Sequence, residues 1–304
     1  MMAYIPLLVF AGIAAGPIVA NVKTLWLKRL SGWLGLLALV AGANFALTEY
    51  SAVSRMVGIC CVLLAGMKGL VYAEWAVGQR LTMSRYLVFA ILWFGMDPGS
   101  FQHSRTGLSW KNDVLVGSIL MIVGTLGAWL VWAMEWRQIL IMFLPMSLGF
   151  HFGALRVLKG GLRAAGFPVR TLFPNLLKAQ GIGDLWSRRW NVGYSQMMQR
   201  LVGRPIESKY GANAGMMTIF LASGLLHELA ITLPVRAGFG LPTLYFTLHG
   251  ILTVIEKKTG RQFGKIPALL AVMAPMGLLF PPAFQTEVIQ ECLGVFDLLK
   301  NAFR

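Results

Sequence analysis

A histidine and a glutamate stand side by side inside an apolar stretch of this sequence. His227 and Glu228 interrupt the run FLASGLLHELAITLP (residues 220–234), which belongs to an apolar segment spanning about 215–233. Ionisable groups are costly in hydrocarbon, so inside membrane segments they face a protein interior or a watery cavity. Histidine titrates nearest to neutrality and is the usual general base. We therefore expect a membrane-embedded chamber built around His227.

A second polar group precedes this stretch, in the segment DLWSRRWN (residues 184–191). Asp184 is a plausible N-cap and Pro205 a stop signal, which predicts a helix between them. Four apolar residues then share one face of that helix: Trp186, Trp190, Met197 and Leu201. Tryptophans on one face and arginines on the others are typical of a helix that lies in the membrane interface, with Asn191 on its polar face.

Composition places the whole chain in a membrane. The 304 residues are 57% hydrophobic and only 13% charged, about half the charged fraction of an ordinary soluble domain. The net charge of +15 would suggest nucleic acid in a soluble protein. In a membrane protein it indicates contact with anionic lipid headgroups on one face, and it also allows an anionic substrate. We therefore expect membrane lipids and no nucleic acid among the partners.

The elements that must position these residues are expected to be membrane helices. The sequence predicts an all-α, polytopic protein of about eight to ten membrane segments. They lie near residues 3–20, 33–48, 55–73, 86–96, 114–134, 138–158, 215–233, 241–255, 266–283 and 286–299. Spanning a bilayer takes about 20 apolar residues, so 86–96 is expected to be re-entrant or interfacial. The first segment lacks the positive start of a cleaved signal peptide and is expected to be retained.

We interpret residues 1–304 as one integral-membrane domain, because no internal repeat or low-complexity tract divides it. Within it, 156–213 is a basic, interfacial region and 170–260 carries the polar motifs. Basic clusters also follow the first segment and occupy 257–265. Lysine and arginine accumulate on the cytoplasmic side of membranes, so we expect these loops to be cytoplasmic. A bacterial inner membrane is favoured over the endoplasmic reticulum.

Together, the two motifs resemble a known superfamily. A segment like DLWSRRWN followed by one like FLASGLLHEL (residues 220–229), and then by an aromatic-rich segment such as LYFTLHGILTVIE (residues 244–256), is similar to the membrane-bound O-acyltransferases. The closest resemblance is to their wax synthase-like branch. The tetrapeptide GMDP at 95–98 also fits this branch. The resemblance covers about 170–260, and the flanking helices match only in hydropathy.

This resemblance implies acyl transfer from a thioester, with acyl-CoA as co-substrate, to a hydroxyl acceptor. A long-chain alcohol is the acceptor expected of this branch, while a sterol, a diacylglycerol or a polar hydroxyl compound stays open. The resemblance also implies that His227 is catalytic and that Asn191 is its partner. His249 stands where a neutral polar residue such as glutamine is more usual in the family. The histidine spacings of metalloenzymes are absent from the sequence, so we predict no metal and no other cofactor.

The same roles follow from the chemistry of ester formation. His227 would take the hydroxyl proton as the oxygen attacks the thioester. The amide of Asn191 would orient the substrate or donate a hydrogen bond to the oxyanion. The sequence lacks a nucleophile-elbow motif, which favours direct transfer through a ternary complex. The basic loop would then face the phosphates of coenzyme A.

Several neighbouring residues are further candidates. We expect substrate-binding roles around Trp190, Arg188, Arg189, Ser223, Glu228 and His249. Ser223 lies one turn before His227 and is expected to hold its imidazole by a hydrogen bond. Glu228 is expected to form a structural ion pair with Arg188 or Arg189. His249 fits either a core position or a tunnel wall, and so does His151, for which the core position is favoured. Asp97 and His103 fit a solvated loop.

Two other classes of function are compatible with an intramembrane histidine and glutamate. A proton-coupled transporter or channel could use them as a relay. The hydropathy pattern shows no repeated halves, however, and transport would leave the RRWN segment unexplained. A catalytically inactive membrane scaffold is the other alternative.

Overall fold

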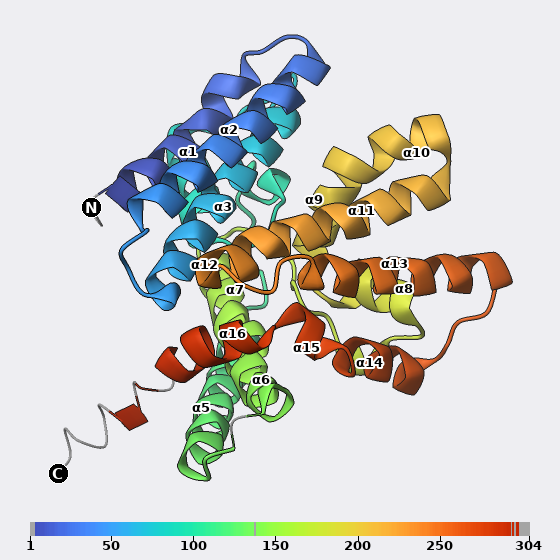
Figure 1. Cartoon of the computed structure of the whole chain (residues 1–304). Coiled ribbons are helices and arrows are strands. Elements are labelled where there is room, and N and C mark those ends of the chain that lie inside the picture. Colours follow the sequence, from blue (N-terminus) through green and yellow to red (C-terminus); the bar gives the residue numbers. More distant parts are fainter. Residues whose placement is uncertain (1–3, 137, 293, 295, 298–304) are drawn as a thin grey trace.

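The structure is a computed structural model that describes residues 4–136, 138–292, 294 and 296–297. All regular elements in this part of the chain are helices (Figure 1). The all-helical fold expected from the sequence is therefore confirmed. The last predicted segment, 286–299, lies partly outside the described residues, and so does the first residue of the segment 3–20.

The N-terminal part is a group of three packed helices, α1 (Tyr4–Ala20), α2 (Leu25–Ala46) and α3 (Ala52–Trp75), followed by the short α4 (Met83–Leu92). Helices α1 and α3 approach closely because glycines face each other. A Cβ on Gly69 would lie 2.6 Å from the carbonyl oxygen of Gly12. Small residues allow such close backbone contact between membrane helices.

A second group projects away from the first as an arm (Figure 1). It consists of α5 (Lys111–Ala133), α6 (Ile139–Ser147), a π-helical turn (Leu148–Ala154) and α7 (Leu155–Ala164). Here too, glycines set the helix separation. A Cβ on Gly124 would lie 2.3 Å from the backbone nitrogen of Gly149. The π-helical turn is thereby held directly against α5.

The region carrying the polar motifs is made of shorter elements. They are α8 (Ile182–Asp184), α9 (Val192–Met198), α10 (Arg204–Tyr210), α11 (Ala212–His227), α12 (Leu233–Val235) and α13 (Leu241–Thr259). The C-terminal elements are α14 (Lys265–Met273), α15 (Met276–Leu279) and α16 (Pro282–Phe284). Helices α11 and α13 lie side by side, and Gly224 of α11 would place a Cβ 2.7 Å from the Thr243 backbone of α13.

Within the described residues, five helices are long and apolar enough to cross a membrane: Leu25–Ala46, Ala52–Trp75, Lys111–Ala133, Ile141–Ala164 and Ala212–Val235. A sixth span results if the pair Lys265–Leu279 and Pro282–Cys292, bent by 79°, counts as one. Helices α1 and α4 are shorter apolar helices. The chain is thus a multi-pass integral membrane protein.

The helix predicted between Asp184 and Pro205 is wrong as a single element. Residues Leu185–Arg189 form a π-helical turn, Trp190 is extended, and a new helix starts after Asn191. Asn191 has the left-handed backbone conformation, with φ of 40° and ψ of 59°, which ends one helix and redirects the chain. The apolar residues 186, 190, 197 and 201 therefore do not form one helical stripe.

Both predicted ends of that helix are also wrong. Asp184 is the last residue of α8, whose N-cap is Gly181. Pro205 lies in the first turn of α10, and that helix continues to Tyr210. Proline is accepted in the first turn because the backbone N–H groups there have no partner within the helix.

Candidate active site

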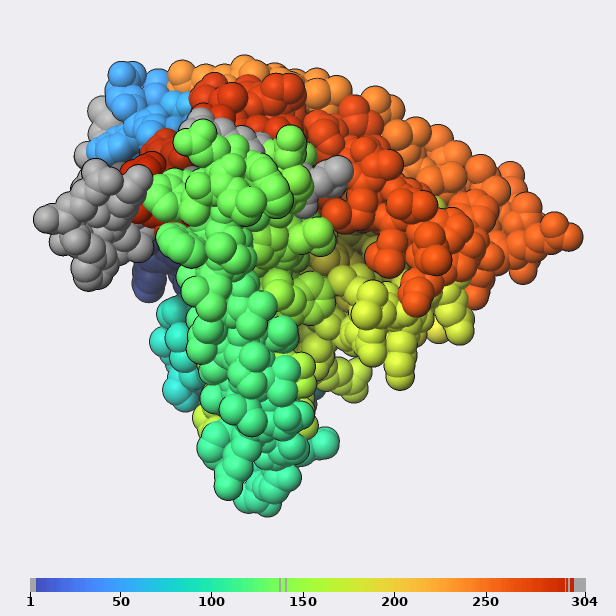
Figure 2. Space-filling view, turned by 90° about the horizontal axis from the view of Figure 1, so that it is seen from below, coloured from blue at the N-terminus to red at the C-terminus, as the bar shows by residue number. Residues whose placement is uncertain are grey.

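The motif residues meet at a large cavity of about 1340 Å³. Seen from below, the surface is hollowed between the green arm, the yellow segment around α8 and the red C-terminal helices (Figure 2). Most of its wall is apolar, with Leu63, Met67, Phe143, Phe246 and Met276 among the lining side chains. Of the residues expected at a site, it brings together His227, Asn191, Trp190, Arg188 and Ser223. The lining does not include Arg189, Glu228 or His249.

His227 is the last residue of α11 and is held in a defined orientation. Its Nδ1 lies 2.7 Å from the backbone carbonyl oxygen of Ser223. A carbonyl can only accept, so the proton is on Nδ1 and Nε2 carries the lone pair. The ring lies against Phe246, with centroids 4.4 Å apart. Ser223 thus holds the imidazole as expected, although through its backbone carbonyl and not through its hydroxyl.

Glu228 does not line the cavity and instead contacts the start of α13. Its Oε1 accepts hydrogen bonds from the backbone N–H groups of Gly240 and Thr243, both at 3.0 Å, and from Thr243 Oγ1 at 2.8 Å. Its Oε2 accepts from Thr232 Oγ1 at 2.5 Å. The carboxylate therefore caps the N-terminus of α13, where a negative charge is stabilising. The separation of Glu228 from His227 that the sequence predicts is confirmed, but its expected arginine partner is wrong.

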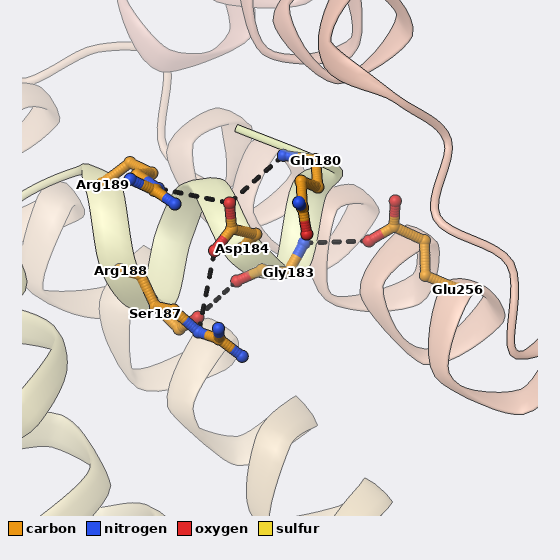
Figure 3. A network of polar contacts seen from close by, with 7 residues as sticks. All are labelled: Gln180, Gly183, Asp184, Ser187, Arg188, Arg189 and Glu256. Atoms are coloured by element: carbon orange, nitrogen blue, oxygen red, sulfur yellow. Dashed lines mark hydrogen bonds and ion pairs between the residues drawn. The ribbon is translucent and has the colours of Figure 1, made fainter. Parts of the chain in front are cut away.

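The arginines of the RRWN motif pair with Asp184 instead. Arg188 Nε and Arg189 Nε lie 3.6 Å and 3.2 Å from the Asp184 carboxylate, and the backbone N–H of Gln180 donates to the same group at 3.1 Å. Figure 3 shows this network between the α8 segment and α13. The side chain of Arg188, which lines the cavity, is 77% exposed, whereas that of Arg189 is 24% exposed.

Glu256 completes this network, and its role is not evident from the sequence. It accepts hydrogen bonds from the backbone N–H groups of Ile182 at 3.1 Å, Gly183 at 2.9 Å and Phe263 at 2.9 Å. Figure 3 shows the bond from Gly183. A buried carboxylate with three such donors is well satisfied. Glu256 therefore fixes the start of the RRWN segment to α13.

Asn191 has a structural function in addition to its place at the cavity. Its Oδ1 accepts a hydrogen bond from the backbone N–H of Tyr194 at 3.3 Å and so caps α9. Among the described residues, no hydrogen bond engages the amide N–H groups of its side chain. They are the part of Asn191 that is available to a substrate.

Trp190 belongs to an aromatic group that also contains a second histidine. Its ring lies 5.0 Å from that of Phe173 and 5.2 Å from that of His151. His151 lies in the π-helical turn of the arm, lines the cavity, and has Nδ1 3.0 Å from Ser147 Oγ. Of the two positions that the sequence allows for His151, the structure therefore has the one in the cavity wall. The only signal in the sequence was the serine one turn before it, inside an apolar segment.

His249 is a core histidine. It is fully buried, and its Nδ1 and Nε2 face the carbonyl oxygens of Tyr245 at 2.8 Å and Ala271 at 3.1 Å. In the GMDP segment, Asp97 caps a short 3₁₀ turn through Gly99 N–H at 3.1 Å. His103 is exposed, as expected of a solvated loop.

Comparison with known proteins identifies the region that carries both motif residues. Residues 169–248 match the Membrane bound O-acyl transferase family. Probable long-chain-alcohol O-fatty-acyltransferase 1 of Arabidopsis thaliana is 31% identical over 161 residues, covering 44% of this chain and 46% of the relative. Probable long-chain-alcohol O-fatty-acyltransferase 2 of the same plant is 27% identical over 162 residues, covering 45% and 46%.

A third relative is the long-chain-alcohol O-fatty-acyltransferase of Simmondsia chinensis, which is 31% identical over 87 residues, or 26% of this chain and 25% of the relative. These matches span less than half the length of the curated relatives. The resemblance drawn from the two motifs is confirmed: residues 169–248, with Asn191 and His227 among them, match the Membrane bound O-acyl transferase family.

Proposed function

We propose that this protein transfers an acyl group from acyl-CoA to a long-chain alcohol within the cavity, with His227 as the general base. The observation that carries the proposal is the orientation of His227. Its Nδ1 is bound to the Ser223 carbonyl at 2.7 Å, while the ring lines an apolar cavity of about 1340 Å³. This arrangement leaves Nε2 as a proton acceptor.

In the proposed reaction, Nε2 of His227 takes the hydroxyl proton as the alcohol oxygen forms a bond to the thioester carbonyl carbon. The side-chain amide of Asn191 donates a hydrogen bond to the carbonyl oxygen as negative charge develops on that oxygen. The carbon–sulfur bond then breaks, and the imidazolium returns the proton to the thiolate. The products are the ester and free coenzyme A, and no covalent enzyme intermediate is needed.

The remaining wall residues fit the two substrates. Apolar side chains would bury acyl and alkyl chains, each buried methylene contributing about 0.8 kcal/mol. Arg188 and Lys257 both line the cavity and would contact the phosphates of coenzyme A. Trp190 and Ser223 would line the substrate path. Arg189, Glu228 and His249 have partners within the protein and would support the wall without touching substrate.

For the membrane arrangement, we propose that α1, α4 and α13 join the longer spans, giving the eight to ten segments expected from the sequence. Helix α4 would be the short or re-entrant piece, and the basic loops would be cytoplasmic. The motif region and the flanking helices would form one domain over residues 1–304. The apolar, outward-facing side chains of α5 support a lipid environment for the arm.

The test is an assay of membranes containing the wild-type protein with labelled acyl-CoA and a panel of acceptors: long-chain alcohols, a sterol, a diacylglycerol and a polar hydroxyl compound. We expect ester product from the long-chain alcohols and a loss of about 10²–10⁴-fold in His227→Ala, the range for removal of a general base. His103→Ala, which removes an exposed histidine, is the matched control. Near-normal esterification by His227→Ala, or substrate flux without ester, would overturn the proposal.

A further inference from the structure

The mechanism above gives no role to Tyr194, although this residue lies between the two motif residues. Tyr194 is on α9, three residues after Asn191, and its hydroxyl donates a hydrogen bond to Ser223 Oγ on α11 at 3.2 Å. Ser223 is 4% exposed and Tyr194 is half-buried, so this contact is partly shielded from solvent. It joins the segment that follows RRWN to the helix that carries His227.

Three hydrogen bonds in sequence therefore connect Asn191 to His227. Asn191 Oδ1 accepts from the Tyr194 backbone N–H at 3.3 Å. The Tyr194 hydroxyl donates to Ser223 Oγ at 3.2 Å. The Ser223 carbonyl accepts from His227 Nδ1 at 2.7 Å. Tyr194 and Ser223 each use different atoms for their two contacts, so the three hydrogen bonds are compatible with one another.

The helical turn around Ser223 borders the cavity and lies just before an irregular turn, so a side-chain hydrogen bond would stabilise its position. On one side it faces the cavity, which removes packing atoms from that face of α11. The next residue is Gly224, which has no side chain and lies against Thr243. Just after His227 the helix widens into the π-helical turn Glu228–Thr232, where the regular α-helical hydrogen bonding stops.

We propose that Tyr194 is a positioning residue for His227: its hydroxyl fixes Ser223, and the Ser223 carbonyl holds the imidazole with the proton on Nδ1 and the basic Nε2 at the cavity. This inference rests on the proposed function. Burial also raises the pKa of Tyr194 above its ordinary value, so the phenol stays protonated and remains a hydrogen-bond donor at neutral pH.

The first test is kinetic. Tyr194→Phe and Ser223→Ala each remove the same hydrogen bond, and each is expected to lower kcat about three- to tenfold. For Tyr194→Phe, KM for both substrates is expected to stay unchanged. The double variant is expected to lose no more than either single variant, because both act through one contact. Tyr86→Phe is the matched control, since it removes a buried hydroxyl that donates to the Ile13 carbonyl away from the cavity.

The second test does not depend on activity, so it separates this inference from the proposed function. The chain has only four histidines, and nitrogen NMR of histidine-labelled protein in liposomes can assign His227 by its absence in His227→Ala. We expect protonated Nδ1 and unprotonated Nε2 in the wild type and in Tyr86→Phe, and a mixture of tautomers in Tyr194→Phe. A wild-type His227 spectrum in Tyr194→Phe, or loss of stability with normal kcat, would overturn the proposal.

Discussion

The side-chain oxygen of Asn191 accepts a hydrogen bond from the backbone N–H of Tyr194, so a residue at the cavity wall also caps the helix that follows it. The Oδ1 atom of Asn191 forms the helix cap, whereas its side-chain N–H groups are the donors that a substrate could use. The family resemblance implies a role at the reaction centre for Asn191, and the structure adds a conformational one. Substitutions can separate the two roles.

Asn191→Asp keeps an oxygen that can cap α9 but removes the amide donor. We expect near-normal thermal unfolding with activity about 10²–10³-fold lower, the usual cost of losing an oxyanion donor. Asn191→Ala also loses the cap and places alanine at a φ of 40°, which should destabilise the protein by about 1–3 kcal/mol. Both are measured by ester formation and thermal unfolding in detergent. Full activity in Asn191→Asp would restrict Asn191 to the helix cap.

Gly181→Ala should disturb the network around Glu256. A Cβ at this position would lie 2.2 Å from Glu256 Oε1, so the carboxylate must move away from the N–H groups of Ile182 and Gly183. We expect a loss of stability of about 1–3 kcal/mol, typical of a broken buried network. Gly161→Ala is the control because nothing lies within 4 Å of its Cβ, and alanine favours a helix over glycine. Equal melting temperatures for the two variants would contradict this prediction.

Asp113 is the shared counter-ion of three cations on α7. It lies 3.2 Å from Arg156, 2.8 Å from Lys159 and 3.6 Å from Arg163, and only 11% of its side chain is exposed. Asp113→Asn leaves these cations to repel one another and should cost about 3 kcal/mol, as when one partner of a buried ion pair is removed. Thermal unfolding tests this value, with the exposed Glu287→Gln as the control. An unchanged melting temperature would show that the cluster is solvated.

Gly124→Ala should force α5 away from the π-helical turn of the arm, because the new Cβ would lie 2.3 Å from the Gly149 nitrogen. Overpacking of this kind costs about 1–3 kcal/mol. The turn carries His151, so the shape of the cavity should change as well, seen as a higher KM for substrates. Gly35→Ala, with nothing within 4 Å of its Cβ, should leave both quantities unchanged. Normal KM and stability in Gly124→Ala would argue against close packing in the arm.

The sequence predicted the membrane class, the all-helical fold and the two motif residues at the cavity, because hydropathy and motif spacing are local signals. It could not predict the break at Trp190 and Asn191, since helical periodicity does not reveal a left-handed residue. The partner of Glu228 was missed because it comes from the start of α13, which is brought close only by the packing of α11 on α13. The sequence could not decide between a core and a cavity-wall position for His151 for the same reason: its aromatic neighbours Phe173 and Trp190 lie on another part of the chain.

The π-helical turn Glu228–Thr232 has a consequence for how this region can vary. A π-turn accommodates one residue more than a regular α-helix of the same rise. Removing one residue from the turn would therefore restore the regular α-helix and leave the chain beyond it in register with the start of α13. A deletion within the regular part of α11 would instead rotate all that follows by about 100°. The length of this helix can thus change by one residue at the π-helical turn, whereas the same change before His227 would separate His227 and Glu228 from their present contacts.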